Sequence, residues 1–507
     1  MNRIFMTAAA LVLLTVCTAR ATIPPTPKLA ERAAELTAGA AQLVQKAFTD
    51  VSHNDAASAQ AKLDKAIHAE DFDDLPTDLR YRALLVASLI AAQNGQDKKA
   101  HETAVRATAF DEADDMAWMT RLSSAFSVGD YSDAGHSVAI FAQRWPEKLG
   151  NVNSDAIWQL HYQYLQEQNP DTDREMLDAL FDAGWLDGGI EPSNLWRDLA
   201  LLHIERNDVA RATAVALRIT SAQAALSMRV DRRFDPITLK RPKEFDVDRL
   251  IAAEIKAAQE RVKAQPDKLE PLADLQGLLL ITGQYARVLS ISDTVLDHAG
   301  RGDGPRTYTD FDDKYPWVLD NRSRAFKRQG RWDDAVHVEV LAARRPEHGG
   351  MNVSQLINLG GLYADLGLPD KAADTIVELG NMSPFGRMQL ESVKLRIAVA
   401  KNDAAAIAAS MDYQREHRAD AIATWEDALL LCGKLDEAAS LLIERLQKPA
   451  WRNAALVDMQ HYADVTETPT EKLIHDRWNT VTARPDVQAA MQKVGRVERF
   501  HMAAALR

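Results

Sequence analysis

Leu356 to Pro384 read LINLGGLYADLGLPDKAADTIVELGNMSP, and this stretch decides the fold. Two apolar segments flank a turn that contains Gly367, and a proline follows the second segment. Apolar residues recur at helical spacing in both segments, and small residues at Gly360 and Ala372 allow two helices to approach closely. The stretch therefore predicts a hairpin of two packed helices, with Pro384 stopping the second helix.

The same pattern recurs along the chain. Trp118, Gly129 and Ala134 mark a clear copy, and Leu84, Gly95 and Ala100 mark another copy 34 residues earlier. Further copies contain Trp196 and Ala212, Leu272 and Gly283, Leu319 and Gly330, and Trp425 and Gly433, and weaker ones begin near Ala40, Asp155 and Met388. No run of alternating β-branched residues is present, so the pattern predicts an all-α chain of stacked hairpins.

The spacing within Leu356–Pro384 matches one known repeat. Leu356, Leu359, Gly360 and Tyr363, followed by Ala372, occupy the signature places of the tetratricopeptide repeat (TPR). The chain resembles this family over roughly residues 40–447. The resemblance implies a right-handed superhelical solenoid in which the first helices of successive repeats line an inner groove for a peptide or protein.

Breaks in the repeat suggest the domain organisation. Residues 222–246 contain a cluster of basic residues and replace part of a first helix, and residues 298–316 form a polar linker. We predict a signal peptide (1–21), a Pro-rich lead-in and first helix (22–39), N-terminal repeats (40–220), an irregular basic insertion and helix (221–268), C-terminal repeats (269–447) and capping helices (448–507).

The N-terminus has the features of an export signal. A basic start at Arg3 precedes an apolar run, and Ala19-Arg20-Ala21 has the form of a signal-peptidase site. We therefore expect a periplasmic or secreted protein. Lipid attachment at Cys17 is an alternative, although the bulky Val16 before it is unusual for a lipoprotein signal. No later stretch is long and apolar enough to span a membrane.

Composition excludes several classes of function. The chain has a net charge of −13 and a pI near 5.5, whereas nucleic-acid binding requires a basic surface. The sequence has no spacing typical of a metal site, no Gly-rich phosphate loop and no nucleophile motif. We therefore expect no nucleic-acid partner, no metal, no cofactor and no catalysis.

Candidate partner-binding residues come from the family pattern and from the basic insertion. Groove positions on first helices, where the resemblance places peptide contacts, are Arg197, Asn321, Arg324, Lys327, Arg328 and Asn358. Arg324 and Arg328 are four residues apart and share a helix face, where they can bind a carboxylate. The basic insertion adds Arg229, Arg232 and Arg233, which either contact an anionic partner or pair with acidic helix surfaces of the chain itself.

These residues favour a non-enzymatic scaffold of the cell envelope that binds a peptide or protein. One alternative is an accessory that binds polysaccharide or peptidoglycan, which exposed aromatic residues would favour. Another is an enzyme with a site in the loops Gly184–Ser193 and Tyr308–Tyr315, where Asp310, Asp312 and Asp313 supply carboxylates. We expect Trp118, Trp158, Trp196 and Trp425 to be packing residues.

Overall fold

The computed structural model describes residues 39–346, 350–377 and 379–503. The predicted signal peptide, Cys17 and most of the lead-in lie outside these ranges. Every regular element of the described residues is a helix, and the only β-type pairings among them are isolated bridges. The predicted all-α class is confirmed. The chain divides into two compact units between Arg218 and Ile219, which we call the N-unit and the C-unit.

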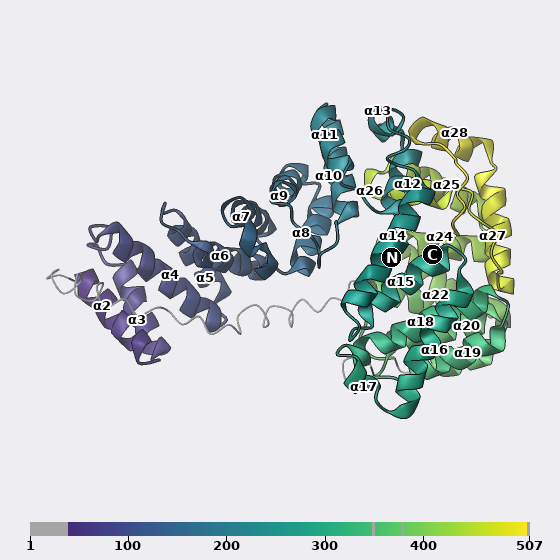
Figure 1. Cartoon of the computed structure of the whole chain (residues 1–507), viewed down its shortest axis with the longest axis horizontal. Coiled ribbons are helices and arrows are strands. Elements are labelled where there is room, and N and C mark those ends of the chain that lie inside the picture. The colour runs from purple at the N-terminus through teal and green to yellow at the C-terminus, as the bar shows by residue number, and fades with distance from the viewer. Residues whose placement is uncertain (1–38, 347–349, 378, 504–507) are drawn as a thin grey trace. The chain divides into compact units, whose positions relative to one another are not determined.

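The N-unit consists of helices that pack in consecutive pairs (Figure 1). Its elements are α2 (Gly39–Ser52), α3 (Ala56–Ile67), α4 (Thr77–Gln93), α5 (Asp97–Thr108), α6 (Asp115–Val128), α7 (Tyr131–Arg144), the 3-10 helix η2 (Pro146–Asn151), α8 (Ser154–Glu167), α9 (Pro170–Asp182), α10 (Ser193–Glu205) and α11 (Val209–Ala216). Asp or Asn caps the N-terminus of α3, α6, α7, α8, α9 and α11, which satisfies backbone N–H groups that would otherwise lack acceptors.

The C-unit continues the hairpins and then adds helices that fold back on them. Its elements are α12 (Ala222–Val230), η3 (Arg232–Phe234), α13 (Asp235–Thr238), α14 (Val247–Ala264), α15 (Glu270–Ile281), α16 (Tyr285–Arg301), α17 (Gly304–Thr307), α18 (Phe311–Arg328), α19 (Trp332–Ala343), α20 (Val353–Asp365), α21 (Pro369–Thr375), α22 (Pro384–Lys401), α23 (Ala404–Glu416), α24 (Ile422–Leu431), α25 (Leu435–Gln447), α26 (Pro449–Asp458), α27 (Pro469–Thr482) and α28 (Pro485–Val494).

The turn inside each hairpin has a recurrent conformation. Gly95, Gly129, Gly283, Gly330, Gly367 and Gly433 separate paired helices and have φ between 67° and 78°. This left-handed conformation is costly for residues with a Cβ atom, so glycine ends the first helix at low cost. Asn207 and Asn402 take the same conformation in the turns of two hairpins that lack the glycine. The glycine positions in the sequence therefore locate the turns.

The hairpin α20–α21 confirms the packing role predicted for its small residues. A Cβ atom added to Gly360 would lie 2.6 Å from Cγ2 of Ile376, and Ala372 is fully buried. The predicted role of Pro384 was wrong, because α21 already ends at Thr375 and Pro384 is the first residue of α22. Proline suits the first turn of a helix, where its missing N–H would have no intrahelical partner.

Two segments expected to be irregular are more helical than predicted. Residues 222–230 form the regular helix α12, which packs on α14. The predicted polar linker 298–316 is divided among the end of α16, the short α17 and the start of α18. Asp312 and Asp313 therefore lie in the first turn of α18, where carboxylates stabilise the helix dipole, and not in a loop.

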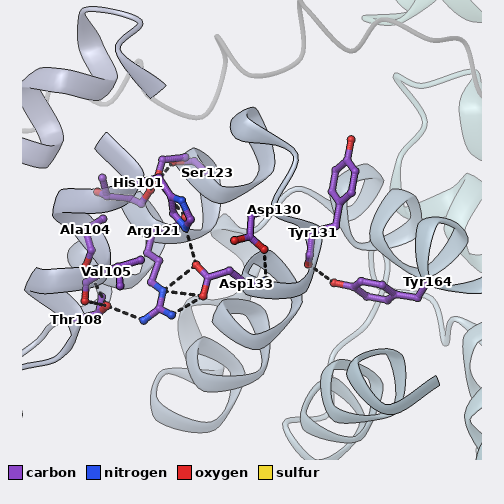
Figure 2. A network of polar contacts seen from close by, with 12 residues as sticks. His101, Ala104, Val105, Thr108, Arg121, Ser123, Asp130, Tyr131, Asp133 and Tyr164 are labelled. Atoms are coloured by element: carbon purple, nitrogen blue, oxygen red, sulfur yellow. Dashed lines mark hydrogen bonds and ion pairs between the residues drawn. The ribbon is translucent and has the colours of Figure 1, made fainter. Parts of the chain in front are cut away.

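Polar contacts link successive hairpins of the N-unit (Figure 2). Arg121 of α6 donates to Asp133 of α7 at 2.9 Å and to Thr108 of α5 at 2.9 Å, and His101 of α5 also contacts Asp133. Because these side chains are largely shielded from water, the network fixes how α5, α6 and α7 meet.

Candidate functional site

Two predicted site residues lie at the C-terminal end of α18 and contact α27. Lys327 Nζ is 2.9 Å from Glu471 Oε1, and the guanidinium of Arg328 is 3.1 Å from the same carboxylate. Arg328 also donates to the Thr466 carbonyl at 2.8 Å. Burial alone would raise the pKa of Glu471, but the two cations and the Thr468 N–H group outweigh it and lower that pKa to about 2. The pair thus binds a carboxylate of the chain itself.

Three other predicted residues make polar contacts to helices of the C-unit. Arg324 Nε lies 2.9 Å from Asp320, and Asn358 Nδ2 donates to Asp320 at 3.2 Å. Asn321 Nδ2 donates at 3.2 Å to the backbone carbonyl of Ala273 in α15. The two asparagines therefore link neighbouring hairpins.

The arginines of the basic insertion also contact the chain itself. Arg229 is 2.7 Å from Glu498, Arg232 donates to the Gly495 carbonyl at 3.1 Å, and Arg233 is 2.6 Å from Asp231. These contacts agree with the interpretation in which the cluster pairs with the chain itself, and binding of an anionic partner by Arg229, Arg232 and Arg233 stays a prediction.

These contacts trace the path of residues 459–503, which we call the C-terminal segment. It contacts the ends of several first helices: Thr470 Oγ1 reaches the carbonyl of Asp365 at the end of α20, and Arg477 donates to the carbonyls of Leu430 and Leu431 at the end of α24. Further on, the N–H of Ala503 donates to the carbonyl of Ile281 at 2.7 Å. Figure 1 shows α27 and α28 of this segment in yellow. Partner binding by the predicted C-unit residues stays a prediction, because the chain's own end contacts this face.

The ninth predicted residue, Arg197, lies in the N-unit on α10. Its guanidinium is 2.8 Å from the carboxylate of Asp198, and its side chain is only 15% exposed. Asp198 also accepts from Nε2 of His161 at 3.3 Å. Arg197 is therefore part of an ion-paired cluster between α8 and α10.

His161 is the centre of this cluster. Its imidazole is almost fully buried, and Nδ1 lies 2.9 Å from Asp173 of α9. Burial alone would lower the pKa of His161, but hydrogen bonds and charge from Asp173 and Asp198 outweigh it and raise that pKa to about 9. The imidazole is therefore protonated at neutral pH. Sequence reasoning missed it because this buried site usually holds a small residue, as Gly360 does in α20.

The outward side of α8, next to His161, exposes large apolar side chains. Trp158, Tyr162 and Leu165 lie on one side of the helix, whereas Ile157, Leu160 and Tyr164 fill the core. Tyr162 is 43% exposed and Leu165 42% exposed. The Trp158 and Tyr162 rings stack with centroids 6.2 Å apart.

The loop after α9 extends this apolar face. Asp187 accepts a hydrogen bond from Nε1 of Trp158 at 3.0 Å, which holds the loop beside α8. Leu186 and Ile190 flank Asp187 and are 42% and 39% exposed. We call Trp158, Tyr162, Leu165, Leu186 and Ile190 the α8 surface.

The α8 surface and the Lys327 region occupy matching places in their repeats. His161 and Asp173 lie 12 residues apart, as do Ser323 and Ala335, and each pair joins the two helices of a hairpin. Leu165 lies four residues after His161, and Lys327 lies four residues after Ser323, so Leu165 and Lys327 occupy equivalent positions in their repeats. The C-terminal segment binds Lys327 through Glu471, whereas Leu165 is exposed.

Of the four tryptophans expected to pack, three are buried: Trp118, Trp196 and Trp425. Trp158 is only half-buried and belongs to the α8 surface. The sequence does indicate that part of α8 is exposed, because this helix has apolar residues on two faces, whereas a surface helix needs only one apolar face.

A surface cavity of about 440 Å³ lies along α9, lined by its polar side chains and by Gln143. Arg211 pairs with Asp178 and Asp182 there, and Arg206 pairs with Asp171. This lining is explained by ion pairs between neighbouring hairpins.

Among the residues with described positions, no group of His, Cys, Asp and Glu is arranged to hold a metal ion. No helix of that same part of the chain is long and apolar enough to cross a membrane.

Comparison with known proteins gives no match to a protein-family model and none to a curated protein. Several solved structures are similar. A tetratricopeptide repeat protein from Parabacteroides merdae ATCC 43184 has 14% identity over 60% of this chain and 93% of its own, with a TM-score of 0.26. The APC/C hetero-tetramer Cut9-Hcn1 has 13% identity over 92% and 91%, with a TM-score of 0.28. Yeast Tom70 has 12% identity over 90% and 99%, with a TM-score of 0.29.

The assignment of TPR-like repeats follows from the hairpins themselves. Their glycine turns, their helix pairing and the contact between Gly360 and Ile376 all agree with the repeat pattern of the sequence.

Proposed function

We propose that this chain is a non-enzymatic scaffold of the cell envelope that binds a peptide or protein partner on the α8 surface of its N-unit. The observation that supports this proposal most directly is the exposure of Tyr162 and Leu165 beside the half-buried Trp158, with exposed Leu186 and Ile190 on the loop that Asp187 holds to Trp158. Soluble proteins expose single apolar residues often, but contiguous patches mark interaction sites.

The types of residue also suit a binding site. Tryptophan and tyrosine are enriched among the residues that dominate binding energy, because they bury a large area with few rotatable bonds. Trp158 is held in place by its stack with Tyr162 and its hydrogen bond to Asp187, so a partner would meet a preorganised surface.

The envelope part of the proposal rests on the predicted signal peptide at residues 1–21. Cell fractionation tests it. Export predicts a mature chain, shorter at its N-terminus, in the envelope or culture medium. Recovery of the protein in the cytosol with Met1 intact would contradict this part of the proposal.

Binding is tested with full-length, affinity-tagged protein crosslinked in its native cells. Tyr162→Ser combined with Leu165→Ser is expected to reduce the recovery of specific partners about tenfold or more, because it removes two central apolar contacts. Leu217→Ser is the matched control, since Leu217 is also exposed (49%) in the N-unit but lies at the end of α11. Circular dichroism checks that all variants fold.

The result against the proposal is the same set of partners, in the same amounts, with the double variant and the wild type. Equal losses with Leu217→Ser would also contradict it, because they would show that any exposed apolar residue matters.

A second candidate is binding of an envelope polysaccharide. The exposed Tyr162 ring beside Trp158 and the Asp187 carboxylate favours it, whereas the burial of Trp118, Trp196 and Trp425 counts against an aromatic-lined groove. Co-sedimentation with purified peptidoglycan, lost in the double variant but kept in Leu217→Ser, would support this candidate over the protein partner. An enzyme is not proposed, because Asp312 and Asp313 lie in the first turn of α18 and Asp310 accepts hydrogen bonds from the backbone N–H groups of Leu269 and Glu270.

A further inference from the structure

The net charge of this chain is unevenly distributed, because Lys and Arg are sparser in the N-unit. Residues 39–218 contain 29 Asp and Glu against 16 Lys and Arg, whereas residues 219–507 contain 42 against 40. The N-unit thus has an excess of 13 negative charges and the C-unit region an excess of two. Charge of one sign on a surface attracts partners of the opposite sign and raises their association rate.

The side chains around the α8 surface follow the same trend. Asp155 is exposed three residues before Trp158 on the same face of α8, and Asp187 lies against the Trp158 ring nitrogen. The one nearby cation on α10 is Arg197, whose guanidinium is ion-paired with Asp198 and mostly buried. A ligand at Trp158 and Tyr162 therefore meets carboxylates.

Aromatic rings beside carboxylates have a defined preference. The negative face of a tyrosine or tryptophan ring attracts a cation within about 6 Å of its centre, and a desolvated contact strengthens the attraction. Arg side chains already stack on aromatic rings elsewhere in the N-unit, where Arg218 lies 4.7 Å from the Phe181 ring centre. On α8, the exposed Tyr162 ring offers the same kind of face to a cation from outside.

We infer that the partner of the α8 surface is a basic protein segment, with a Lys or Arg side chain on the Tyr162 ring and an apolar side chain against Leu165. This inference rests on the proposed function and adds the chemistry of the partner. The cation lies over the Tyr162 ring, and the carboxylates of Asp155 and Asp187, which lie one turn away beside Trp158, attract it at longer range; the apolar contact sets its position along the helix.

The test uses full-length protein and fluorescein-labelled decapeptides of alternating leucine with arginine, citrulline or glutamate. Citrulline has the shape of arginine without its charge. Fluorescence anisotropy in 150 mM NaCl is expected to show at least about fivefold tighter binding of the arginine peptide than of the citrulline peptide. Tyr162→Leu should remove most of that preference, whereas Tyr162→Phe should keep it, because phenylalanine retains the ring.

A matched pair of variants separates a local site from general attraction to an acidic unit. Asp155→Asn with Asp187→Asn removes two charges beside the α8 surface. Asp73→Asn with Glu102→Gln removes two exposed charges elsewhere in the N-unit. The first pair of substitutions is expected to lower the affinity for the arginine peptide about fivefold or more, and the second pair is expected to lower it less than twofold.

Three results would overturn the inference: equal binding of the arginine and citrulline peptides, equal effects of the two charge pairs, or displacement of the arginine peptide by purified peptidoglycan. Failure here is distinguishable from failure of the proposed function. If cellular partners still depend on Tyr162 and Leu165 while charge has no effect, the docking surface stands and its basic partner does not.

Discussion

Replacing His161 by glutamine is expected to destabilise the α8–α9 hairpin at neutral pH and to have little effect above pH 9. The buried imidazole lies between Asp173 and Asp198, with the Tyr162 ring 5.7 Å away and Arg197 on the far side of Asp198. In the wild type these groups hold a protonated imidazole. Glutamine keeps a hydrogen-bonding side chain but leaves the carboxylates without this cation.

The magnitude follows from the pKa of His161, which rises from 6.5 to about 9 on folding. A shift of that size corresponds to about 3 kcal/mol of stability. Because the folded-state pKa is raised, the contribution is fully present below pH 6.5. It is lost as the pH rises from 6.5 through 9, where the imidazole loses its proton in the folded state as well.

Hydrogen exchange with mass spectrometry of peptides from α8 and α9, corrected for intrinsic exchange rates, measures this locally. Wild-type protection should fall between pH 6.5 and 9, and His161→Gln should lower protection at pH 6.5 and remove that fall. His136→Gln is the matched control, because His136 also pairs with a carboxylate, Glu175, but is 42% exposed. A wild type with constant protection over this range, or a His161→Gln variant with the wild-type pH dependence, would refute the reasoning.

Three further predictions concern the C-unit. Arg445→Met should lower the free energy of unfolding by about 3–5 kcal/mol, because it leaves Glu426 buried without its cation; a loss under 1 kcal/mol in urea titrations would contradict this. Glu471→Gln should increase hydrogen exchange in α27 at pH 7, and wild-type α27 should lose protection only as the pH falls from 4.5 towards 2, in line with the lowered pKa of Glu471; unchanged exchange in the variant would count against the contact with Lys327. Gly360→Val should cost about 1–3 kcal/mol in thermal unfolding, and Ile376→Ala should restore part of the loss; additive losses would show that the two do not collide.

The sequence predicted the hairpins well because their determinants are local. In most hairpins a glycine marks the turn, and a small residue 12 positions before another identifies the contact between the two helices, as Gly360 and Ala372 do. The error at Pro384 has a local cause too. Proline suits both the residue after one helix and the first residue of the next, and sequence spacing alone does not separate the two.

The surroundings of the candidate residues could not be predicted, because they depend on contacts between residues far apart in sequence. Arg328 and Glu471 are 143 residues apart, and Arg229 and Glu498 are 269 apart. No repeat pattern relates such pairs. At the α8 surface, Trp158 and Tyr162 have residue types that suit a core as well as an interface, so only their exposure in the folded chain distinguishes the two.

The return of the C-terminal segment to the first hairpins of the C-unit has a consequence for biogenesis. Arg496 N–H binds the carbonyl of Val230 in α12, Ala503 N–H binds that of Ile281 in α15, and α26 packs on α12. An open repeat array can fold one hairpin at a time as it is made, since each repeat contacts only its neighbours. The C-unit instead needs residues 496–503 to complete the contacts of its first helices, so it finishes folding only after these residues have been synthesised.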